Sequence, residues 1–157
     1  MPSFETTRRV TFSPAQMFDL VADVEKYPEF LPLCEGLRVL SRDKDLSNEV
    51  VVAAMDVGYK AIRETFTSRV TLDRGALTVR ADLVDGPFRQ MENRWRFEST
   101  PEGCEVRFFI TYEFKSMMLQ MLVGAVFEQA FRRFAEAFET RAKVVYGGQP
   151  AIAPGRG

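Results

Sequence analysis

Five polar residues stand at positions where the surrounding pattern is apolar, and they are the first candidates for chemistry. They are Arg8, Glu64, Ser68, Asn93 and Gln120. Each one alone could be a strand-end residue that reaches water, or a buried group bonded to backbone. Together they favour a concave interior that side chains do not completely fill, which is the usual form of a small-molecule site. Glu64 and Arg8 could equally form a structural ion pair.

Few residues in this chain could take part in enzymatic catalysis. The absence of histidine excludes histidine-based acid–base catalysis, histidine-activated nucleophiles and the commonest metal ligand. Cys34 would be a poorly activated nucleophile, and Glu64 or a surface carboxylate would have to act as acid or base. Cys34 and Cys104 form no metal-binding motif and are expected to be reduced thiols. We therefore expect a non-enzymatic protein with no catalytic residue, no metal and no cofactor.

Composition indicates one soluble domain. The chain has 157 residues, 46% of them hydrophobic and 27% charged, and its 14 phenylalanines predict an aromatic interior. A net charge of −1 gives no reason to expect direct DNA binding, because phosphate binding needs a concentrated basic surface. The N-terminus lacks an apolar signal core, and no run approaches the ~18 apolar residues of a spanning helix. We expect a cytoplasmic protein, with peripheral contact at the inner face of the membrane at most.

The longest element available to position these residues is the stretch Met117–Val145. It contains no proline and one glycine, and it predicts a single uninterrupted helix. The four phenylalanines between residues 127 and 138 fall within a narrow arc, so this half should pack on an apolar surface. The first turns are apolar in every direction and need core, ligand or membrane around them. Their methionines are either core filler or an adaptable binding surface. Gln120 projects into the same arc as the phenylalanines.

The first 34 residues predict a strand, a helix and an apolar connector. Residues 4–12 alternate as a strand with one mostly apolar face. Ser13-Pro14-Ala15-Gln16 combines a cap, an N-terminal proline and a capping box, so a helix should run to about Val24. In the connector Tyr27–Cys34, two prolines four residues apart permit only a short helical turn between them. Its apolar residues either enter the core or line the rim of a cavity.

Residues 37–114 predict a run of antiparallel strands. The predicted ranges are 37–41, 48–57, 60–72, 76–84, 88–98 and 104–114, with turn signals at Gly58, 73–75, 85–87 and 100–103. Strand 48–57 is nearly continuously apolar, so which of its residues face inward stays open. Strands with one polar and one apolar face suit a sheet that is covered on one side. The predicted fold class is α+β, with a curved antiparallel sheet of about seven strands around a long C-terminal helix. We expect one domain over residues 1–146 and a disordered tail over 147–157.

Three segments resemble the START-like coenzyme Q-binding proteins of the polyketide cyclase/dehydrase-related superfamily. They are Tyr27-Pro-x-Phe30-Leu31-Pro32-x-Cys34, Asp85-Gly86-Pro87-Phe88 running on to Trp95-x-Phe97, and Phe131-x-x-Phe134. The resemblance covers nearly everything from Pro2 to Val145. It implies a helix-grip fold around an elongated apolar tunnel. It also implies binding of ubiquinone, as a ligand and not as a redox cofactor, in support of respiration.

The chain looks equally like the bacterial ribosome-association toxins, which are described as blocking the joining of ribosomal subunits. The absence of a basic tail or patch argues mildly against this role. A cyclase or aromatase that uses Glu64 is a further alternative. The expected partners are therefore a lipid quinone, transiently a membrane surface and, on the alternative hypothesis, the ribosome.

The quinone hypothesis assigns a role to each candidate residue. The isoprenoid tail is expected to lie along Phe66, Met91, Trp95, Phe97, Val123 and Phe127. Asn93 and Gln120 would donate hydrogen bonds to the quinone carbonyls. The mouth of the tunnel, able to touch a membrane, is expected at Phe30, Leu31, Leu33, Met118 and Leu122. Glu64, Met117 and Met121 complete the predicted ligand-binding set.

Overall fold

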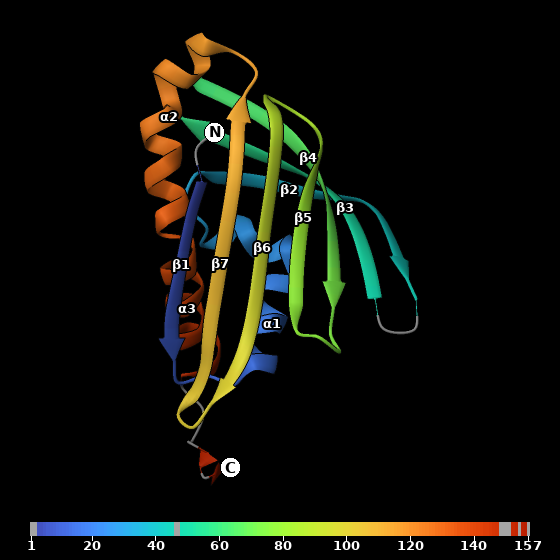
Figure 1. Ribbon diagram of the computed structural model, residues 1–157, viewed down its shortest axis with the longest axis vertical. Helices are drawn as coiled ribbons and strands as arrows, with labels where there is room; N and C mark the ends of the chain where they lie inside the picture. Colours follow the sequence, from blue (N-terminus) through green and yellow to red (C-terminus); the bar gives the residue numbers. More distant parts are fainter. Residues whose placement is uncertain (1–2, 46–47, 148–151, 154, 157) are drawn as a thin grey trace.

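A seven-stranded antiparallel sheet curves around the helices in the computed structural model, which describes residues 3–45, 48–147, 152–153 and 155–156. The strands are β1 (Ser3–Val10), β2 (Cys34–Lys44), β3 (Asn48–Tyr59), β4 (Ile62–Asp73), β5 (Thr78–Asp85), β6 (Phe88–Thr100) and β7 (Gly103–Phe114). Their order is β1-β7-β6-β5-β4-β3-β2, so each strand from β2 to β6 pairs with the next along the chain and β1 pairs with β7 (Figure 1). The predicted fold class is confirmed.

The strand boundaries differ most from prediction in β2 and at the end of β3. β2 runs from Cys34 to Lys44, well beyond the predicted 37–41, because it pairs with β3 as far as Lys44 opposite Glu49. Its second half is exposed, so it lacks the alternation of apolar and polar residues from which the other strands were predicted. Gly58 lies inside β3, and the turn follows at Lys60, whose φ of 54° is left-handed.

The first helix begins as predicted. In α1 (Pro14–Ala22), the Ser13 hydroxyl accepts a hydrogen bond from the Gln16 backbone N–H at 3.1 Å, and the Gln16 side chain accepts one from the Ser13 N–H at 2.9 Å. This reciprocal capping box satisfies two otherwise unpaired donors. The short 3₁₀ helix η1 (Val24–Glu29) includes Pro28 and ends before Pro32, so the helical turn comes earlier than predicted.

The prediction of one uninterrupted C-terminal helix is wrong. The stretch forms α2 (Met117–Arg132) and α3 (Phe134–Tyr146), separated at Arg133 with φ −102° and ψ 0°. The Arg133 N–H donates to the Ala130 carbonyl at 3.0 Å, three residues back, which tightens the turn. α2 contacts β7 and β1, whereas α3 contacts β1 and α1. Phe131 and Phe134, on either side of the break, both face the same interior, with ring centroids 5.4 Å apart.

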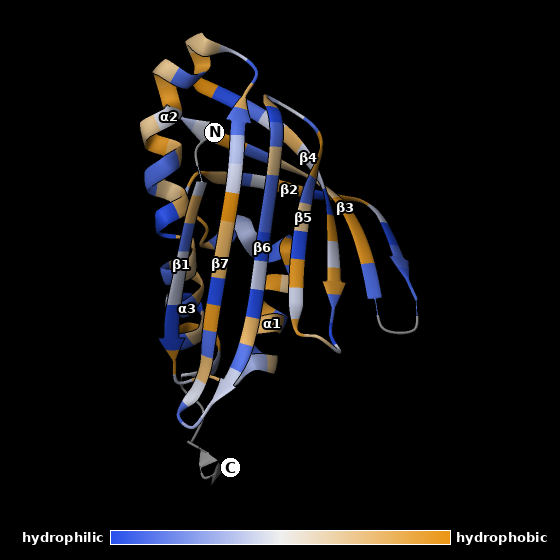
Figure 2. Cartoon of the chain, viewed as in Figure 1, coloured by the Kyte–Doolittle hydropathy of each residue, from blue (hydrophilic) through white to orange (hydrophobic). Residues whose placement is uncertain are grey.

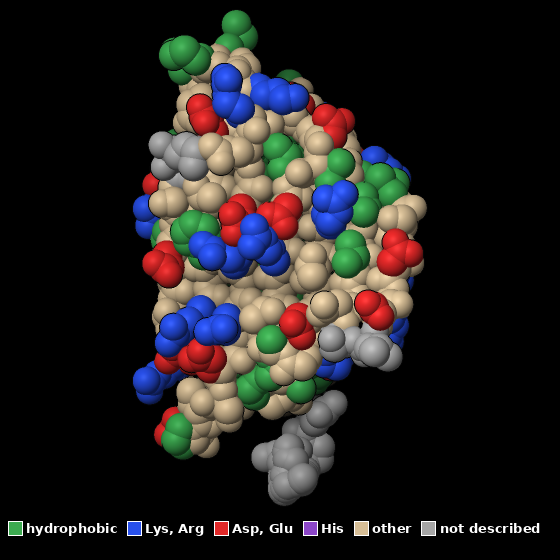
Figure 3. Space-filling model, turned by 45° about the vertical axis from the view of Figure 1, so that its right-hand side comes forward, with side chains coloured by type: hydrophobic (Ala, Val, Ile, Leu, Met, Phe, Trp, Pro, Cys, Tyr) green, Lys and Arg blue, Asp and Glu red, His purple; other side chains and the backbone are tan. Residues whose placement is uncertain are grey.

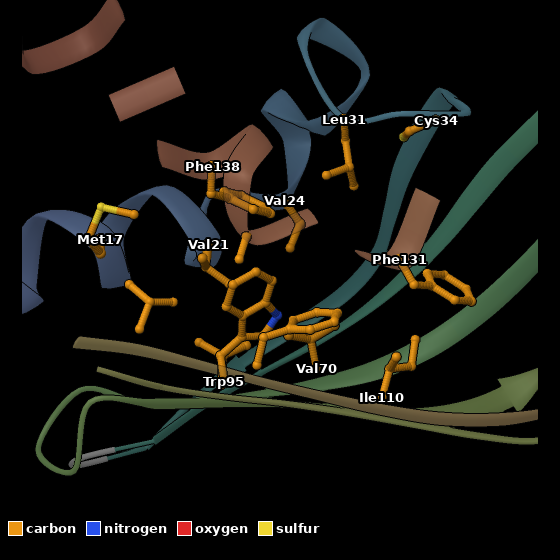
Figure 4. Close-up of a cluster of buried hydrophobic side chains, with 14 of the residues drawn as sticks. Met17, Val21, Val24, Leu31, Cys34, Val70, Trp95, Ile110, Phe131 and Phe138 are labelled. Atoms are coloured by element: carbon orange, nitrogen blue, oxygen red, sulfur yellow. The ribbon is translucent and has the colours of Figure 1, made fainter. Parts of the chain in front are cut away.

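The core lies between the concave face of the sheet and the helices. Apolar and polar residues alternate along the strands in Figure 2, as expected when one face is covered. In Figure 4, Trp95, Val70 and Ile110 rise from the sheet toward Phe138, Phe131 and Leu31 of the opposite layer. The Trp95 ring lies 4.7 Å from that of Phe108 and 5.1 Å from that of Phe138. The interior is therefore aromatic, as the composition predicted.

The two cysteines, Cys34 and Cys104, are buried free thiols, as expected. No helix in the described part of the chain is long and apolar enough to span a membrane. The predicted disordered tail, 147–157, lies mostly outside the described residues. Within it the structure describes Gly147 and the two-residue parallel strands β8 (Ile152–Ala153) and β9 (Gly155–Arg156).

Candidate functional site

An apolar cavity lies between the concave face of the sheet and the layer formed by η1, the connector after it, α2 and α3. The volume of this cavity is about 90 Å³. Strands β3 to β7 supply one wall, and the phenylalanines of α2 and α3 supply the other. No charged side chain of the described residues lines it. A charged group placed there would lose its hydration without compensation, so this cavity suits a neutral, largely hydrocarbon ligand.

Seven of the predicted ligand-binding residues line this cavity. They are Leu31, Leu33, Phe66, Met91, Asn93, Trp95 and Phe127. They come from the connector, from β4, β6 and α2. Strand alternation placed the β-strand members correctly because one face of each strand is covered.

Three other predicted residues are packed nearby but do not line the cavity. Phe97 and Val123 are fully buried in the core, where the Phe97 ring lies edge-on to that of Phe18 on α1. Phe30 is half-buried, with its ring 5.0 Å from that of Phe138 and beneath the Arg141 guanidinium. These side chains form part of the cavity's support.

The predicted inward direction of Gln120 differs from the structure, in which Gln120 is exposed. It lies along its own helix over Gly124, where an added Cβ would be 2.1 Å from Nε2 of Gln120. Exposure extends to most of the first two turns of α2. Met117, Met118, Met121 and Leu122 are 83%, 71%, 83% and 59% exposed. We call these four side chains the methionine patch.

Glu64 and Arg8 do not meet. Glu64 lies opposite Val57 on β3, is half-buried and does not line the cavity. Arg8 instead pairs with Glu139 of α3, so the structural ion pair considered from the sequence is wrong in its partner. The partner of Arg8 is therefore a carboxylate on a helix, which the alternation of residues along the strands could not predict.

Several residues that line the cavity were not in the predicted ligand-binding set, and for those of β3 the sequence did not show which ones face inward. Ala53, Met55 and Val57 of β3 line the cavity, which settles the orientation of strand 48–57. Phe131, Phe134 and Phe138 face it from the helices, and Tyr27 from η1. The sequence predicts a ligand contact for Phe127 of the phenylalanine arc and mainly core packing for the other three.

Three polar side chains line the cavity, and two of them are already bonded. The Asn93 amide donates to the Phe109 carbonyl at 2.9 Å, and its oxygen accepts from the Trp95 indole N–H at 2.9 Å. The Tyr27 hydroxyl donates to the Val21 carbonyl. The Ser68 residue is only 7% exposed, and its hydroxyl has no hydrogen-bond partner among the described residues. Buried hydroxyls without partners are uncommon in folded proteins.

Burial holds the acidic groups beside the cavity in their neutral forms. The pKa of the Tyr27 phenol is raised, mainly by burial and then by the nearby Cys34 and Asp23. Burial likewise raises the pKa of the Cys34 thiol to about 11, and a hydrogen bond with the backbone of Gly36 opposes this shift. A thiol with this pKa is a poor nucleophile near neutral pH, because the thiolate is the reactive form.

Backbone geometry near the cavity restricts two positions. Leu33 has a left-handed φ of 68°, and its carbonyl accepts a hydrogen bond from the Gly58 N–H at 3.1 Å. Such strain in a non-glycine residue persists only where the surroundings impose it. Gly86 has φ 148°, and an added Cβ would lie 2.4 Å from Cβ of Phe66. The turn between β5 and β6 therefore needs glycine in order to approach a cavity wall.

The convex face of the sheet is charged but internally neutralised. Figure 3 shows basic and acidic side chains adjacent on it. Arg94 pairs with Glu92 at 3.1 Å, and Arg107 pairs with Glu105 at 3.0 Å. Among the described residues, no group of histidine, cysteine or carboxylate side chains could hold a metal ion. The cavity is therefore the strongest candidate for a functional site.

Comparisons with known proteins agree with this architecture. The family described as polyketide cyclase/dehydrase and lipid transport matches residues 10–139. Ribosome association toxin RatA of Escherichia coli is 36% identical over 93% of this chain and 90% of its own. Coenzyme Q-binding protein COQ10 homolog B, mitochondrial, of Xenopus laevis is 32% identical over 93% of this chain and 60% of its own. The solution structure of an 18 kDa protein from Caulobacter crescentus superimposes with a TM-score of 0.77 at 33% identity, covering 94% of this chain and 100% of that one.

Proposed function

Because this chain belongs to the START-like polyketide cyclase/dehydrase and lipid transport family, we propose that it binds a neutral isoprenoid quinone, ubiquinone, and does not convert it chemically. The observation that carries the proposal is the uncharged cavity lined by aromatic and aliphatic side chains. The similarity to a coenzyme Q-binding protein supports the choice of quinone. The protein would carry the lipid in support of respiratory electron transport or quinone synthesis.

The cavity must open to receive such a ligand. Its volume of about 90 Å³ is well below the ~300–1,000 Å³ of sites for drug-sized ligands. The break at Arg133 divides the covering layer into α2 and α3, so α2 can shift while α3 stays packed on α1. Phe127 and Phe131 would move with α2 and uncover the aromatic wall. The ligand would enter there, between α2 and the connector that holds Leu33.

The methionine patch provides the route by which a lipid reaches this opening. Hydrophobic side chains project at the end of the molecule where α2 begins (Figure 3). Exposed Lys115 lies immediately before this helix and would attract anionic headgroups. Unbranched methionine side chains adapt to an irregular apolar surface. We propose that the patch contacts the inner face of the membrane transiently and that no anchoring segment is needed.

Trp95 offers a direct test because it is the chain's one tryptophan and it lines the cavity. Purified protein freed of lipid is titrated with decylubiquinone, and the Trp95 fluorescence is recorded. Saturable quenching at one quinone per chain is expected. Decylubiquinone that quenches only in proportion to its concentration, without saturation, would contradict the proposal.

A role at the ribosome is the second candidate function. It rests on the 36% identity with a ribosome association toxin over nearly the whole chain. In that case an exposed face of the protein, and not the cavity, would bind the ribosome. The neutralised convex face offers little unpaired positive charge for RNA. This candidate predicts co-sedimentation with a ribosomal subunit at physiological salt and arrested growth on overexpression, and the absence of both would remove it.

A cyclase-like activity is supported less well than binding. Glu64, its one proposed acid or base, does not line the cavity, and the chain offers no histidine to assist it. The enzymatic alternative predicts that Glu64→Gln abolishes turnover of a polyketide substrate and leaves its binding intact. The non-enzymatic proposal predicts that neither protein changes the ligand chemically, which mass spectrometry of the recovered ligand can test.

A further inference from the structure

The unpaired hydroxyl of Ser68 is the one polar group of the cavity that the fold does not use among the described residues. Ser68 lies at the middle of β4 and is 7% exposed. Its neighbours across the sheet are Ala53 on β3 and Leu83 on β5, neither of which can hydrogen-bond through its side chain. Two residues away along β4 on either side are Phe66 and Val70. Its surroundings therefore offer hydrocarbon alone.

Small residues leave space in front of this hydroxyl. Ala53 lies directly opposite Ser68, and Ala81 of β5 also lines the cavity. The pairing of β4 with β5 shifts between Thr67 and Ser68, so that Thr67 faces Asp85 while Ser68 faces Leu83. Bulges of this kind often re-aim a side chain next to a binding site. The small side chain of Ala53 therefore leaves room beside the Ser68 hydroxyl on the wall of the cavity.

The other two polar groups are committed to the protein. Asn93 uses its oxygen for Trp95 and one N–H for Phe109, which leaves at most one N–H for a ligand. Tyr27 gives its hydroxyl proton to Val21. The Ser68 hydroxyl, in contrast, can both donate and accept. It can therefore satisfy a carbonyl or a hydroxyl group placed at the same position.

We infer that Ser68 is the specificity-determining polar contact of this cavity, and that the cavity selects neutral lipids with a carbonyl or hydroxyl group over anionic lipids of similar length. This inference rests on the proposed quinone-binding function and deepens it. A quinone carbonyl would accept a hydrogen bond from Ser68, and the hydroxyl of the reduced quinol would donate one to it. A fatty-acid carboxylate would find no cation there and would lose its hydration uncompensated.

The test compares the unaltered protein with three variants in the Trp95 quenching titration. Ser68→Ala removes the hydroxyl, Ser68→Thr keeps it, and Thr67→Ala removes a hydroxyl from the neighbouring position as a matched control. We expect Ser68→Ala to weaken decylubiquinone binding by about tenfold. The Thr67→Ala control should bind within about twofold of the unaltered protein, and Ser68→Thr should bind closer to it than Ser68→Ala does. Urea denaturation of Ser68→Ala should show no loss of stability, because a buried hydroxyl without a partner contributes none.

Two further probes separate hydrogen bonding from apolar contact. Decylbenzene, which lacks a carbonyl, should displace decylubiquinone from the unaltered protein and from Ser68→Ala with equal affinity. 4-Decylbenzoate, which adds only a carboxylate to decylbenzene, should displace it at least tenfold less well than decylbenzene. If Ser68→Ala folds poorly, Ser68→Cys supplies the same comparison, because a thiol hydrogen-bonds weakly, and weaker quinone binding is again expected.

The outcomes separate this inference from the function on which it rests. Unaltered protein that binds no decylubiquinone would overturn both. Unaltered protein and Ser68→Ala that bind it equally well would overturn only the role of Ser68. 4-Decylbenzoate that displaces the quinone as well as decylbenzene does would overturn the selection against anionic lipids.

Discussion

The side-chain oxygen of Asn93 accepts a hydrogen bond from the indole N–H of Trp95, with 2.9 Å between Oδ1 and Nε1. The two residues are neighbours on the concave face of β6, and the Asn93 amide also donates to the Phe109 carbonyl on β7. Asn93 thereby satisfies two buried groups and orients the largest ring of the cavity wall. Its first role is structural, although the sequence suggested a direct contact with the ligand.

Replacing Asn93 with leucine should destabilise the fold. The indole N–H and the Phe109 carbonyl would both lose a partner, and each buried unsatisfied group costs about 1–3 kcal/mol. We expect the free energy of unfolding to fall by about 2–4 kcal/mol in urea denaturation followed by Trp95 fluorescence. The exposed Gln129→Ala on α2 serves as a control and should change it by less than about 0.5 kcal/mol. An Asn93→Leu protein as stable as the control would show that these bonds contribute nothing net.

Changing the methionine patch should abolish membrane contact without unfolding the protein. All four side chains are largely exposed, so replacing them with glutamine removes little buried surface. We expect flotation with anionic phospholipid vesicles to fall at least tenfold while the urea midpoint stays unchanged. Val144→Gln, which alters an equally exposed side chain at 71% on α3, should float like the unaltered protein. Undiminished flotation of the patch variant would assign membrane contact to another surface.

Filling the cavity should exclude the ligand. Ala81 lines the cavity beside Asn93 on β6, so Ala81→Phe would occupy space that the ligand needs. Quinone uptake from vesicles, measured in the separated protein by chromatography, should fall at least tenfold. Ala125→Phe on the exposed side of α2 is the matched control and should retain uptake. If both variants take up quinone equally, the ligand lies outside this cavity.

Stability should decline in alkaline solution. Burial raises the pKa of the Cys34 and Cys104 thiols to about 11, and it raises that of Tyr27 as well. An unfolded thiol releases its proton near pH 8.5, so the unfolded chain holds fewer protons than the folded protein above that pH. The stability contributed by the neutral thiols is therefore complete below about pH 8.5 and is lost as the pH rises toward 11.

Urea midpoints measured between about pH 7 and 10.5 would check this expectation. The midpoint should stay level up to about pH 8.5 and fall above it. The double variant Cys34→Ala, Cys104→Ala should show a shallower fall, because Tyr27 alone remains among these three groups. A midpoint that rises with pH in this range would contradict the assignment of burial as the cause of the raised pKa values.

Much of the fold could be predicted because strand alternation and capping are local signals. Ser13 and Gln16 form the predicted capping box, and the alternation in β4 and β6 places Phe66, Trp95 and Asn93 on the concave face. A covered face and an open face impose different residue types on successive positions. The same rule failed for the second half of β2, an edge strand whose residues are exposed.

The rest of the site depends on contacts between elements that are distant in sequence. No proline or glycine marks the helix break at Arg133, which accompanies the approach of Phe131 and Phe134 to the cavity. A helical projection placed Gln120 in the phenylalanine arc, seven residues before Phe127, but it cannot show that most of the first two turns stay exposed. Likewise, the sequence presented Ser68 and Asn93 as inward polar residues and favoured Asn93 as the contact to the quinone. Only the neighbours across the sheet show that one is bonded and the other is not.

If this protein carries a neutral isoprenoid quinone in its cavity, the lipid should remain bound when the protein is purified. The full chain would be purified without detergent from a host that makes ubiquinone, and an organic extract would be examined by mass spectrometry, with Ala81→Phe prepared in parallel. Ubiquinone is expected in the extract of the unaltered protein and should be lost from the Ala81→Phe extract. Unaltered protein that carries no quinone or other isoprenoid, and takes none up when supplied with it, would exclude quinone binding in this cavity.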